Sequence, residues 1–304
     1  MTIKHFNFRV HIHMGAHKTA STFIQSWLTK NRHFLRENHI AYIPLQKLRQ
    51  NFTPAFSALT TDKDKLLPIK TARLRHILFT EAESCGFDLA ATRLLIISEE
   101  NLLGSMSTLH TKGVLYPALK GRMRVLARIF ADYETQPFLA LRNYSEFYPS
   151  AYAETFRKGF IKPFEQYMEG LDLAGNSWPV VIEKVESALG PTRLWPYEQF
   201  QDNAHVVLSE LLQTPIGADR VDVDTIIRKS LTQKGLDVAM RCRNILSAAE
   251  MKELINLLAE KMRFEAPDDK ISIRDNKTVV NLDNKYTNDL QQLASRLIIA
   301  GAGL

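Results

Sequence analysis

The chain has little cysteine. Cys85 and Cys242 are its only two thiols in 304 residues, and they lie far apart in the sequence. Small domains that depend on disulfides for their stability are dense in cysteine, so this composition excludes that class. We expect both cysteines to be reduced and unpaired.

Long apolar runs are also missing. A membrane-spanning helix needs about 18 or more consecutive apolar residues, and no such run occurs. The sequence enters its first alternating apolar stretch directly, without a charged and then apolar leader. We therefore expect a cytoplasmic protein without a membrane span. The hydrophobic share of 45% is ample for a buried core, and with no repeat or flexible linker visible we expect one domain over residues 1–304.

The excess of positive charge is small. Lys and Arg number 39 against 33 Asp and Glu, which gives a net charge of +6. Such a balance suits an anionic ligand, and the same balance also serves nucleic-acid binding. The basic residues are spread along the chain, and no nucleic-acid-binding module is recognisable. We expect no nucleic-acid partner.

Apolar runs alternate between strand-like and helix-like patterns. This alternation predicts an α/β fold, with a parallel central sheet, helices on both faces and ligands at the carboxyl ends of the strands. The expected strands are 8–14, 40–43, 94–98, 137–142 and one near 192–195. The expected helices between them are 20–36, 70–84, 118–133 and 145–157.

The C-terminal third is mainly helical by pattern. We expect helices over 204–212, 231–246, 248–262 and 284–297, which together form a helical layer over the sheet at roughly 204–304. Two polar segments, 50–67 and 266–277, are interrupted by proline and are expected to be surface loops.

The most informative segment joins the first strand to the first helix. A loop at that junction aims free backbone N–H groups and the positive end of the helix dipole at an anion. Lys18 adds a point charge, and short hydroxyl side chains add donors. The segment does not fit the triphosphate loop Gly-x4-Gly-Lys-Ser/Thr, because His17 stands where the second glycine is required. Its residues are Gly15, Ala16, His17, Lys18, Thr19, Ala20, Ser21 and Thr22.

This loop resembles the 5′-phosphosulfate loop of sulfotransferases that use 3′-phosphoadenosine 5′-phosphosulfate (PAPS), written Gly-x-x-Lys-Thr-Gly-Thr-Thr. Ala20 replaces the second glycine and Ser21 replaces a threonine. A second stretch also resembles that family: an apolar run ends in Arg142, and Ser150 follows eight residues later. In the family, an Arg and a Ser at this spacing hold the 3′-phosphate of the nucleotide.

Two lesser stretches extend the resemblance. Residues 94–102 are similar to the strand that ends in Ser-x-Glu-Asn, and residues 194–200 to the strand that precedes a Tyr-Glu pair. The resemblance implies a P-loop-type fold and PAPS as the sulfuryl donor, with 3′-phosphoadenosine 5′-phosphate as its product. It also implies that residues 15–22 bind the cofactor, with Thr19, Ser21 and Thr22 holding the 5′-phosphate. Lys18 would contact the bridging oxygen and the sulfuryl group, and Arg142 and Ser150 would bind the 3′-phosphate.

A hydroxyl acceptor needs a base. Glu100 ends its strand where the family places a carboxylate or histidine, and partial burial would raise its pKa toward useful values. Glu99 is the alternative, since a slip of one residue exchanges which side chain faces the site; His17 is a third candidate. One of the two glutamates would otherwise cap the next helix or pair with a cation.

His11, His13 and His17 invite a metal interpretation, but no carboxylate or thiol stands beside them to complete a ligand shell. We expect no metal site.

The family members that act on small phenols carry an Arg-Lys-Gly-x-x-Gly segment near the C-terminus. Here the only Arg-Lys-Gly is at 157–159. This departure favours the bacterial, glycan-modifying type of enzyme, with a carbohydrate hydroxyl or amine as acceptor. Arg157 and Lys158 are candidates for contact with the phosphate or the acceptor. Two alternatives stay open: an ATP-dependent phosphotransferase with an acidic metal ligand at Glu99 or Glu100, and a non-catalytic anion-binding relative.

Overall fold

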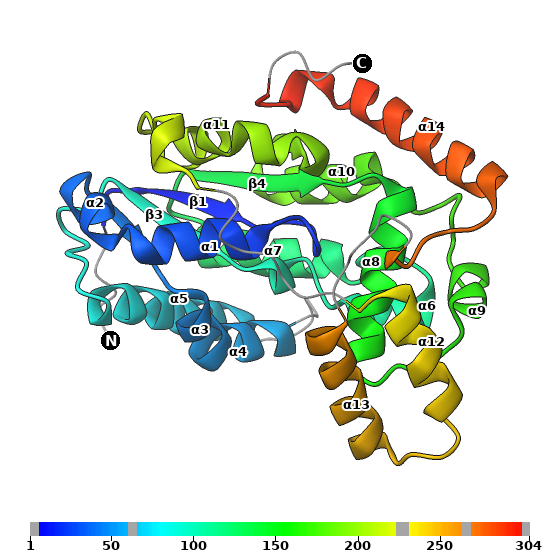
Figure 1. Ribbon diagram of the computed structural model, residues 1–304. Coiled ribbons are helices and arrows are strands. Elements are labelled where there is room, and N and C mark those ends of the chain that lie inside the picture. Colours follow the sequence, from blue (N-terminus) through cyan, green and yellow to red (C-terminus); the bar gives the residue numbers. More distant parts are fainter. Residues whose placement is uncertain (1–5, 60–65, 223–230, 263–268, 300–304) are drawn as a thin grey trace.

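The central strand of the fold is β1 (Arg9–His13), which pairs in parallel with β3 on one side and β4 on the other. The computed structural model describes residues 6–59, 66–222, 231–262 and 269–299 (Figure 1). Its sheet has five parallel strands in the order β2-β3-β1-β4-β5. The predicted α/β class is confirmed. The other strands are β2 (Ile40–Tyr42), β3 (Leu94–Ser98), β4 (Thr135–Leu141) and β5 (Arg193–Pro196).

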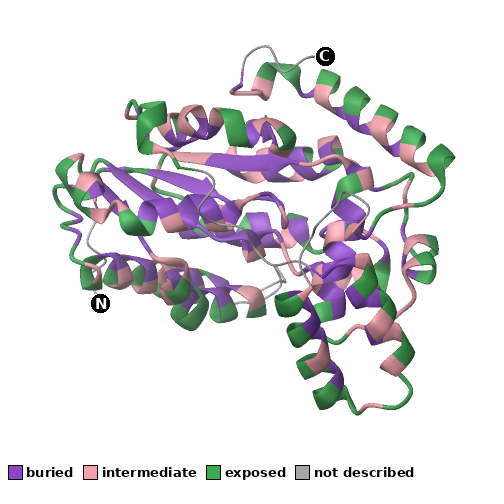
Figure 2. Cartoon of the chain, in the orientation of Figure 1, coloured by how far each residue is buried: buried purple, intermediate pink, exposed green. Residues whose placement is uncertain are grey.

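Burial on both faces explains why the strands are apolar throughout. Every residue of β3 is buried, as expected for a parallel strand covered by helices on each side. In β1 the alternation places Val10 and Ile12 on one face, and the intervening His11 and His13 are buried as well. Figure 2 shows this continuous burial along the strands.

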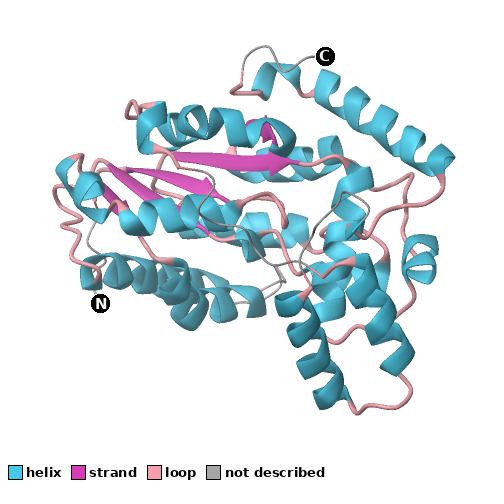
Figure 3. Cartoon of the chain, in the orientation of Figure 1, coloured by secondary structure: helices cyan, strands magenta, loops and turns pink. Residues whose placement is uncertain are grey.

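Helices cover both sides of the sheet (Figure 3). On one side α1 (Ser21–Lys30) meets α11 (Phe200–Leu212) through an edge-to-face contact between Phe23 and Phe200. On the other, α7 packs between α5 and α10. The remaining helices are α2 (Arg32–Glu37), α3 (Leu45–Lys47), α4 (Thr53–Ala58), α5 (Leu67–Ser84), α6 (Met106–Lys112), α7 (Leu119–Ile129), α8 (Tyr144–Arg157), α9 (Phe164–Glu169), α10 (Trp178–Leu189), α12 (Gln233–Cys242), α13 (Ala248–Lys261) and α14 (Asn276–Gln292).

Two predicted elements differ in the first 60 residues. The single helix expected over 20–36 is broken at Asn31, whose backbone N–H and side-chain amide both donate to the carbonyl of Trp27. The surface loop expected over 50–67 is wrong for residues 50–58, which form the end of a π-helix (η1, Leu48–Phe52) and then α4. Pro54 starts α4, and the buried, stacked rings of Phe52 and Phe56 fix it to the core. Residues 60–65 lie outside the described ranges.

The second expected loop, 266–277, is irregular over 269–275, while 263–268 lie outside the described residues. Helix α14 begins at Asn276 instead of 284, because the carboxylate of Asp275 accepts the backbone N–H groups of Lys277 and Thr278 and caps the helix.

The C-terminal helices do not form one layer over the sheet. Helix α11 packs beside β5, whereas α12 and α13 form a hairpin that packs against α8 beyond the carboxyl ends of the strands (Figure 1). Helix α14 lies against α8 and α10. This part of the chain therefore reaches the edge of the sheet where the motif residues lie.

Both cysteines are free thiols, as the sequence predicts. Across the described ranges, none of the helices combines the length and the apolar character that crossing a membrane requires.

Candidate functional site

The loop between β1 and α1 is folded into an unusual backbone conformation. Gly15, Lys18 and Ala20 have positive φ angles of 41°, 68° and 59°. For residues other than glycine this region costs about 1–3 kcal/mol each, and such residues cluster at ligand-binding sites. A Cβ atom at Gly15 would collide with the hydroxyl of Ser21, and the positive φ also disfavours any other residue, so glycine is required there. The backbone of the loop therefore turns tightly just before α1 begins.

The N-terminus of α1 presents backbone N–H and hydroxyl donors beside this loop. Among the residues that the structure describes, no side chain caps the helix and none forms a hydrogen bond with the buried hydroxyl of Ser21. Both features leave donors available to an anion. Thr19 is different, because its hydroxyl donates to the carbonyl of Ala16 inside the loop. The side chain of Thr19 thus stabilises the loop, which differs from the direct phosphate contact expected for it.

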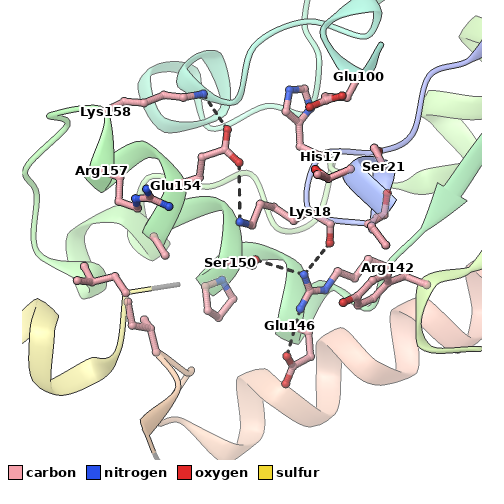
Figure 4. Close-up of a pocket in the computed structure, with 18 of the residues that line it drawn as sticks. His17, Lys18, Ser21, Glu100, Arg142, Glu146, Ser150, Glu154, Arg157 and Lys158 are labelled. Carbon is pink, nitrogen blue, oxygen red and sulfur yellow. Dashed lines mark hydrogen bonds and ion pairs between the residues drawn. The ribbon is translucent and has the colours of Figure 1, made fainter. Parts of the chain in front are cut away.

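A pocket of about 750 Å³ opens in front of the loop (Figure 4). It brings together residues that are far apart in the sequence, including most of the predicted site. Gly15 and Ala16 are not part of its wall, while Arg49, Asn256 and Lys270 belong to it without having been predicted. The predicted residues that line the pocket are His17, Lys18, Thr19, Ala20, Ser21, Thr22, Glu100, Arg142, Ser150, Arg157 and Lys158.

Arg142 connects the loop to α8. Its Nη1 donates to the carbonyl of Lys18 at 2.8 Å and to the hydroxyl of Ser150 at 3.2 Å. The guanidinium lies 4.7 Å from the ring centre of Tyr197, and its buried Nε has no hydrogen-bond partner within the described ranges. Nη2 lies 3.4 Å from a carboxylate oxygen of Glu146. Arg142 and Ser150, predicted as a pair, are therefore in contact and share one wall with the loop.

Two carboxylates of α8 neutralise cations of the pocket. The Nζ of Lys18 lies 3.9 Å from Glu154, and Lys158 lies 2.7 Å from the same carboxylate. Burial would raise the pKa of Glu154, but the hydrogen bond from Lys158 and the nearby positive charges lower it below its ordinary value. Glu154 is therefore ionised at neutral pH. Glu146 pairs with Arg142.

Glu99 and Glu100 end β3 with different surroundings. Glu99 is wholly buried: it caps the 3-10 helix Glu100–Leu102 by accepting the N–H of Asn101, and it accepts a bond from Thr53. Glu100 lines the pocket and accepts a hydrogen bond of 3.1 Å from Gln25. The alternative in which one glutamate caps the following helix therefore holds for Glu99.

Arg49 pairs with both carboxylates. Its Nη2 lies 2.8 Å from Glu100 Oε1 and 3.1 Å from Glu99 Oε1, and its Nε lies 3.1 Å from Glu99 Oε2. Burial alone would raise the pKa of Glu100, but the attraction of the His17 ring when it is protonated and of Arg49, together with hydrogen bonds that include that of Gln25, lower it to about 2. The expected rise is wrong, because these partners, among them Arg49 from a distant part of the chain, lie beside Glu100.

His17 lies between these two groups of carboxylates (Figure 4). Its Nδ1 lies 3.2 Å from the hydroxyl of Tyr116 and its Nε2 lies 3.3 Å from Asn101 Oδ1, so the network assigns the ring proton to Nε2. Burial lowers the pKa of His17, which leaves the ring neutral at neutral pH. Its contacts with Tyr116 and Asn101 therefore hold the His17 ring in one orientation where it lines the pocket.

His11 and His13 point into the core. Nδ1 of His11 bonds the carbonyl of Leu211, and Nδ1 of His13 bonds the hydroxyl of Ser98. Burial lowers the pKa of each ring to about 4. Among the described residues, no group of three or more histidine, cysteine or acidic side chains is arranged to hold a metal ion.

No protein-family model matches this chain, and no curated protein matches it significantly. One solved structure that it resembles is a sulfotransferase. That protein comes from Alicyclobacillus acidocaldarius and shares 13% sequence identity; the match covers 86% of this chain and 98% of that one, with a TM-score of 0.37. The chemistry of the site is argued below from its own residues.

The residues missed by sequence reasoning reach the pocket from unexpected elements. Arg49 lies in the π-helix, next to a segment expected to be a loop. Asn256 and Lys270 come from the C-terminal portion. Glu154 carried a usable signal, because it lies four residues after Ser150 on α8 and so shares its helical face.

Proposed function

We propose that this chain is a sulfotransferase that moves a sulfuryl group from PAPS to a hydroxyl or amine of an acceptor, with a carbohydrate as the acceptor class that the motif resemblance implies. The observation that carries the proposal is the pair of bonds made by Arg142, to the carbonyl of Lys18 and to the hydroxyl of Ser150. These bonds join two anion-binding groups, the N-terminus of α1 and the Arg142–Ser150 pair, into one wall. A nucleotide with phosphates at two ends needs two such groups.

The residues fit this nucleotide in their donor chemistry. The hydroxyl of Ser21 and the Nε of Arg142 are buried polar atoms that find no partner in the described part of the chain, and a buried donor is costly to leave unpaired. Phosphate oxygens would satisfy both. We assign the 5′-phosphate to the N–H groups of the first turn of α1 with Ser21 and Thr22, and the 3′-phosphate to Arg142 and Ser150.

PAPS supplies an activated sulfuryl group, and this chain supplies charge and position. Lys18 is the cation of the loop, and its ammonium, together with the dipole of α1, stabilises negative charge that develops on the leaving phosphate. Glu100, facing the same pocket, takes the proton that the acceptor hydroxyl loses as its oxygen bonds to sulfur. Asn256 of α13 and the neighbouring Lys270 and Ile271 also line the pocket, and we assign the acceptor to this part of it.

The ATP-dependent alternative needs a carboxylate free to bind a metal ion. Glu99 accepts bonds from Arg49, Thr53 and Asn101, and Glu100 is paired with Arg49. Both carboxylates at the end of β3 are therefore engaged by protein donors. This arrangement favours sulfuryl transfer, in which cationic side chains and backbone N–H groups carry the charge.

The experiment that separates an enzyme from a binding module is a turnover assay with labelled PAPS and a panel of mono- and oligosaccharides. We expect label transfer by the wild type and its loss in Lys18→Ala and Glu100→Gln. The exposed residues Lys120 and Glu183 provide the matched controls Lys120→Ala and Glu183→Gln, which should retain full activity. Binding of the nucleotide by the wild type without transfer to any acceptor would favour the non-catalytic alternative.

A further inference from the structure

Arg49 is placed as a cover over the two glutamates at the end of β3. Its side chain is 41% exposed and lines the pocket, whereas the side chains of Glu99 and Glu100 are 0% and 11% exposed. Arg49 projects from a π-helix, an element that occurs frequently at functional sites. Any acceptor that approaches Glu100 from the pocket therefore meets the guanidinium of Arg49.

The contacts allow Arg49 to leave Glu100 without leaving Glu99. One nitrogen, Nη2, is shared between the two carboxylates, while Nε bonds only Glu99. Nη1 has no hydrogen bond to any residue that the structure describes. A small shift of the guanidinium would keep the bonds to Glu99, release Glu100 and present Nη1 and Nη2 to a ligand.

A neutral hydroxyl is a poor competitor for this guanidinium, because hydrogen bonds between charged partners are about twice as strong as those between neutral groups. A carboxylate or sulfate on the acceptor can compete with Glu100 for this guanidinium, since it is also charged and offers two oxygens to the planar fork. Building on the proposed function, we propose that Arg49 selects acceptors that carry an anionic group beside the reacting hydroxyl, and that pairing with this group frees Glu100 to accept the proton of that hydroxyl.

Arg49 is the cation that hydrogen-bonds Glu100. His13 from β1 and His17 from the loop face Glu100, and both rings are neutral at neutral pH because burial lowers their pKa. Gln25 donates from α1 without bearing a charge. The other neighbours are Glu99 and the hydroxyls of Tyr42 and Tyr116, while Arg122 donates to the carbonyl of Asn101. Loss of the positive charge of Arg49 removes one of the interactions that lower the pKa of Glu100, and so strengthens Glu100 as a base.

The test measures binding of matched acidic and neutral acceptors to the enzyme saturated with 3′-phosphoadenosine 5′-phosphate. The probes are 4-nitrophenyl β-glucuronide against the β-glucoside, and 4-nitrophenyl β-galacturonide against the β-galactoside, each titrated by calorimetry. We expect the acidic member of at least one pair to bind about tenfold more tightly or better, the ratio that one charge-assisted bond supplies.

The preference should fall below about threefold in Arg49→Gln and be partly retained in Arg49→Lys, because the lysine keeps the charge but lacks the fork. Removing Arg49 alone leaves Glu99 buried without its counter-ion, which destabilises a fold. The double variant Arg49→Gln with Glu99→Gln removes both charges and serves if the single variant unfolds.

Affinity for the bisphosphate itself should be unchanged in all three variants. If the bisphosphate binds and no acidic probe is preferred, or if the preference survives Arg49→Gln or the double variant, the inference is refuted while the proposed function stands. If the bisphosphate does not bind to the wild type, the proposed function is refuted and this inference falls with it.

Discussion

Replacing Arg142 with lysine should separate recognition of the 3′-phosphate from recognition of the rest of the nucleotide. The guanidinium reaches the carbonyl of Lys18 and the hydroxyl of Ser150, and it lies over the ring of Tyr197. Lysine keeps the positive charge but has a single ammonium, so it cannot serve the loop, Ser150 and a phosphate at once.

The magnitude follows from the bonds at stake. A hydrogen bond to a charged partner contributes about 1.5–3 kcal/mol, and Arg142→Lys removes at least one such bond to the 3′-phosphate. Since about 1.4 kcal/mol is a factor of ten in affinity, binding of 3′-phosphoadenosine 5′-phosphate should weaken by about 10- to 150-fold. Adenosine 5′-phosphate lacks the 3′-phosphate. Its affinity should therefore fall only to the extent that the loop depends on the hydrogen bond from Arg142 to the carbonyl of Lys18.

Calorimetric titration of both nucleotides into the wild type and the variant measures the difference. The exposed arginine of α7, Arg128, gives the matched control Arg128→Lys, which should bind both nucleotides as the wild type does. Equal weakening for the two nucleotides would show that Arg142 only supports the loop. No weakening for either would remove Arg142 from the site altogether.

Three further predictions concern the loop, the competing carboxylates and the buried histidines. Ala20→Gly should stabilise the fold by about 0.5–1 kcal/mol in urea unfolding, because glycine adopts its φ of 59° without strain, whereas Ala127→Gly inside α7 should destabilise it by a similar amount. Destabilisation by Ala20→Gly would contradict the claim that the positive φ of Ala20 is strained. Glu146→Gln should tighten binding of the bisphosphate severalfold in a titration at low salt, because the carboxylate 3.4 Å from Arg142 competes with phosphate; unchanged affinity would contradict this. His11 and His13 have a pKa near 4 in the fold and near 6.5 when unfolded, so stability should be full above about pH 6.5 and fall by up to about 3 kcal/mol for each ring as the pH drops to 4, and a flat urea-unfolding profile over that range would contradict it.

The strands and the edge they share were predictable from local pattern. The apolar runs at β1, β3 and β4 were long and bounded, and parallel order places their carboxyl ends together. The pairing of Arg142 with Ser150 came from the resemblance to the sulfotransferase motif, and the structure brings the two side chains into contact because one ends a strand and the other lies on the helix that follows it.

The chemistry of Glu100 was not predictable in this way. Its pKa depends in part on Arg49, which lies 51 positions earlier in the chain. Arg49 adjoins a segment that was expected to be a loop because most of its residues are polar, although Phe52 and Phe56 pack there as a stacked pair. The C-terminal residues of the pocket were missed for a similar reason. Asn256 lies on α13, which packs against α8, and Lys270 is joined to Thr232 by an isolated bridge. Amphipathic helices do not reveal from sequence which neighbour they will cover.

Thermal unfolding with and without 3′-phosphoadenosine 5′-phosphate tests the proposed cofactor class most directly, with ATP and magnesium as the comparison and Lys18→Ala as the control variant. A ligand at about a hundred times its dissociation constant stabilises the folded state by about 2.7 kcal/mol, which raises the melting temperature by several degrees. We predict that shift with the bisphosphate, a reduced shift in Lys18→Ala and none with ATP and magnesium. A shift with ATP and magnesium alone would contradict the sulfotransferase proposal and favour a phosphotransferase.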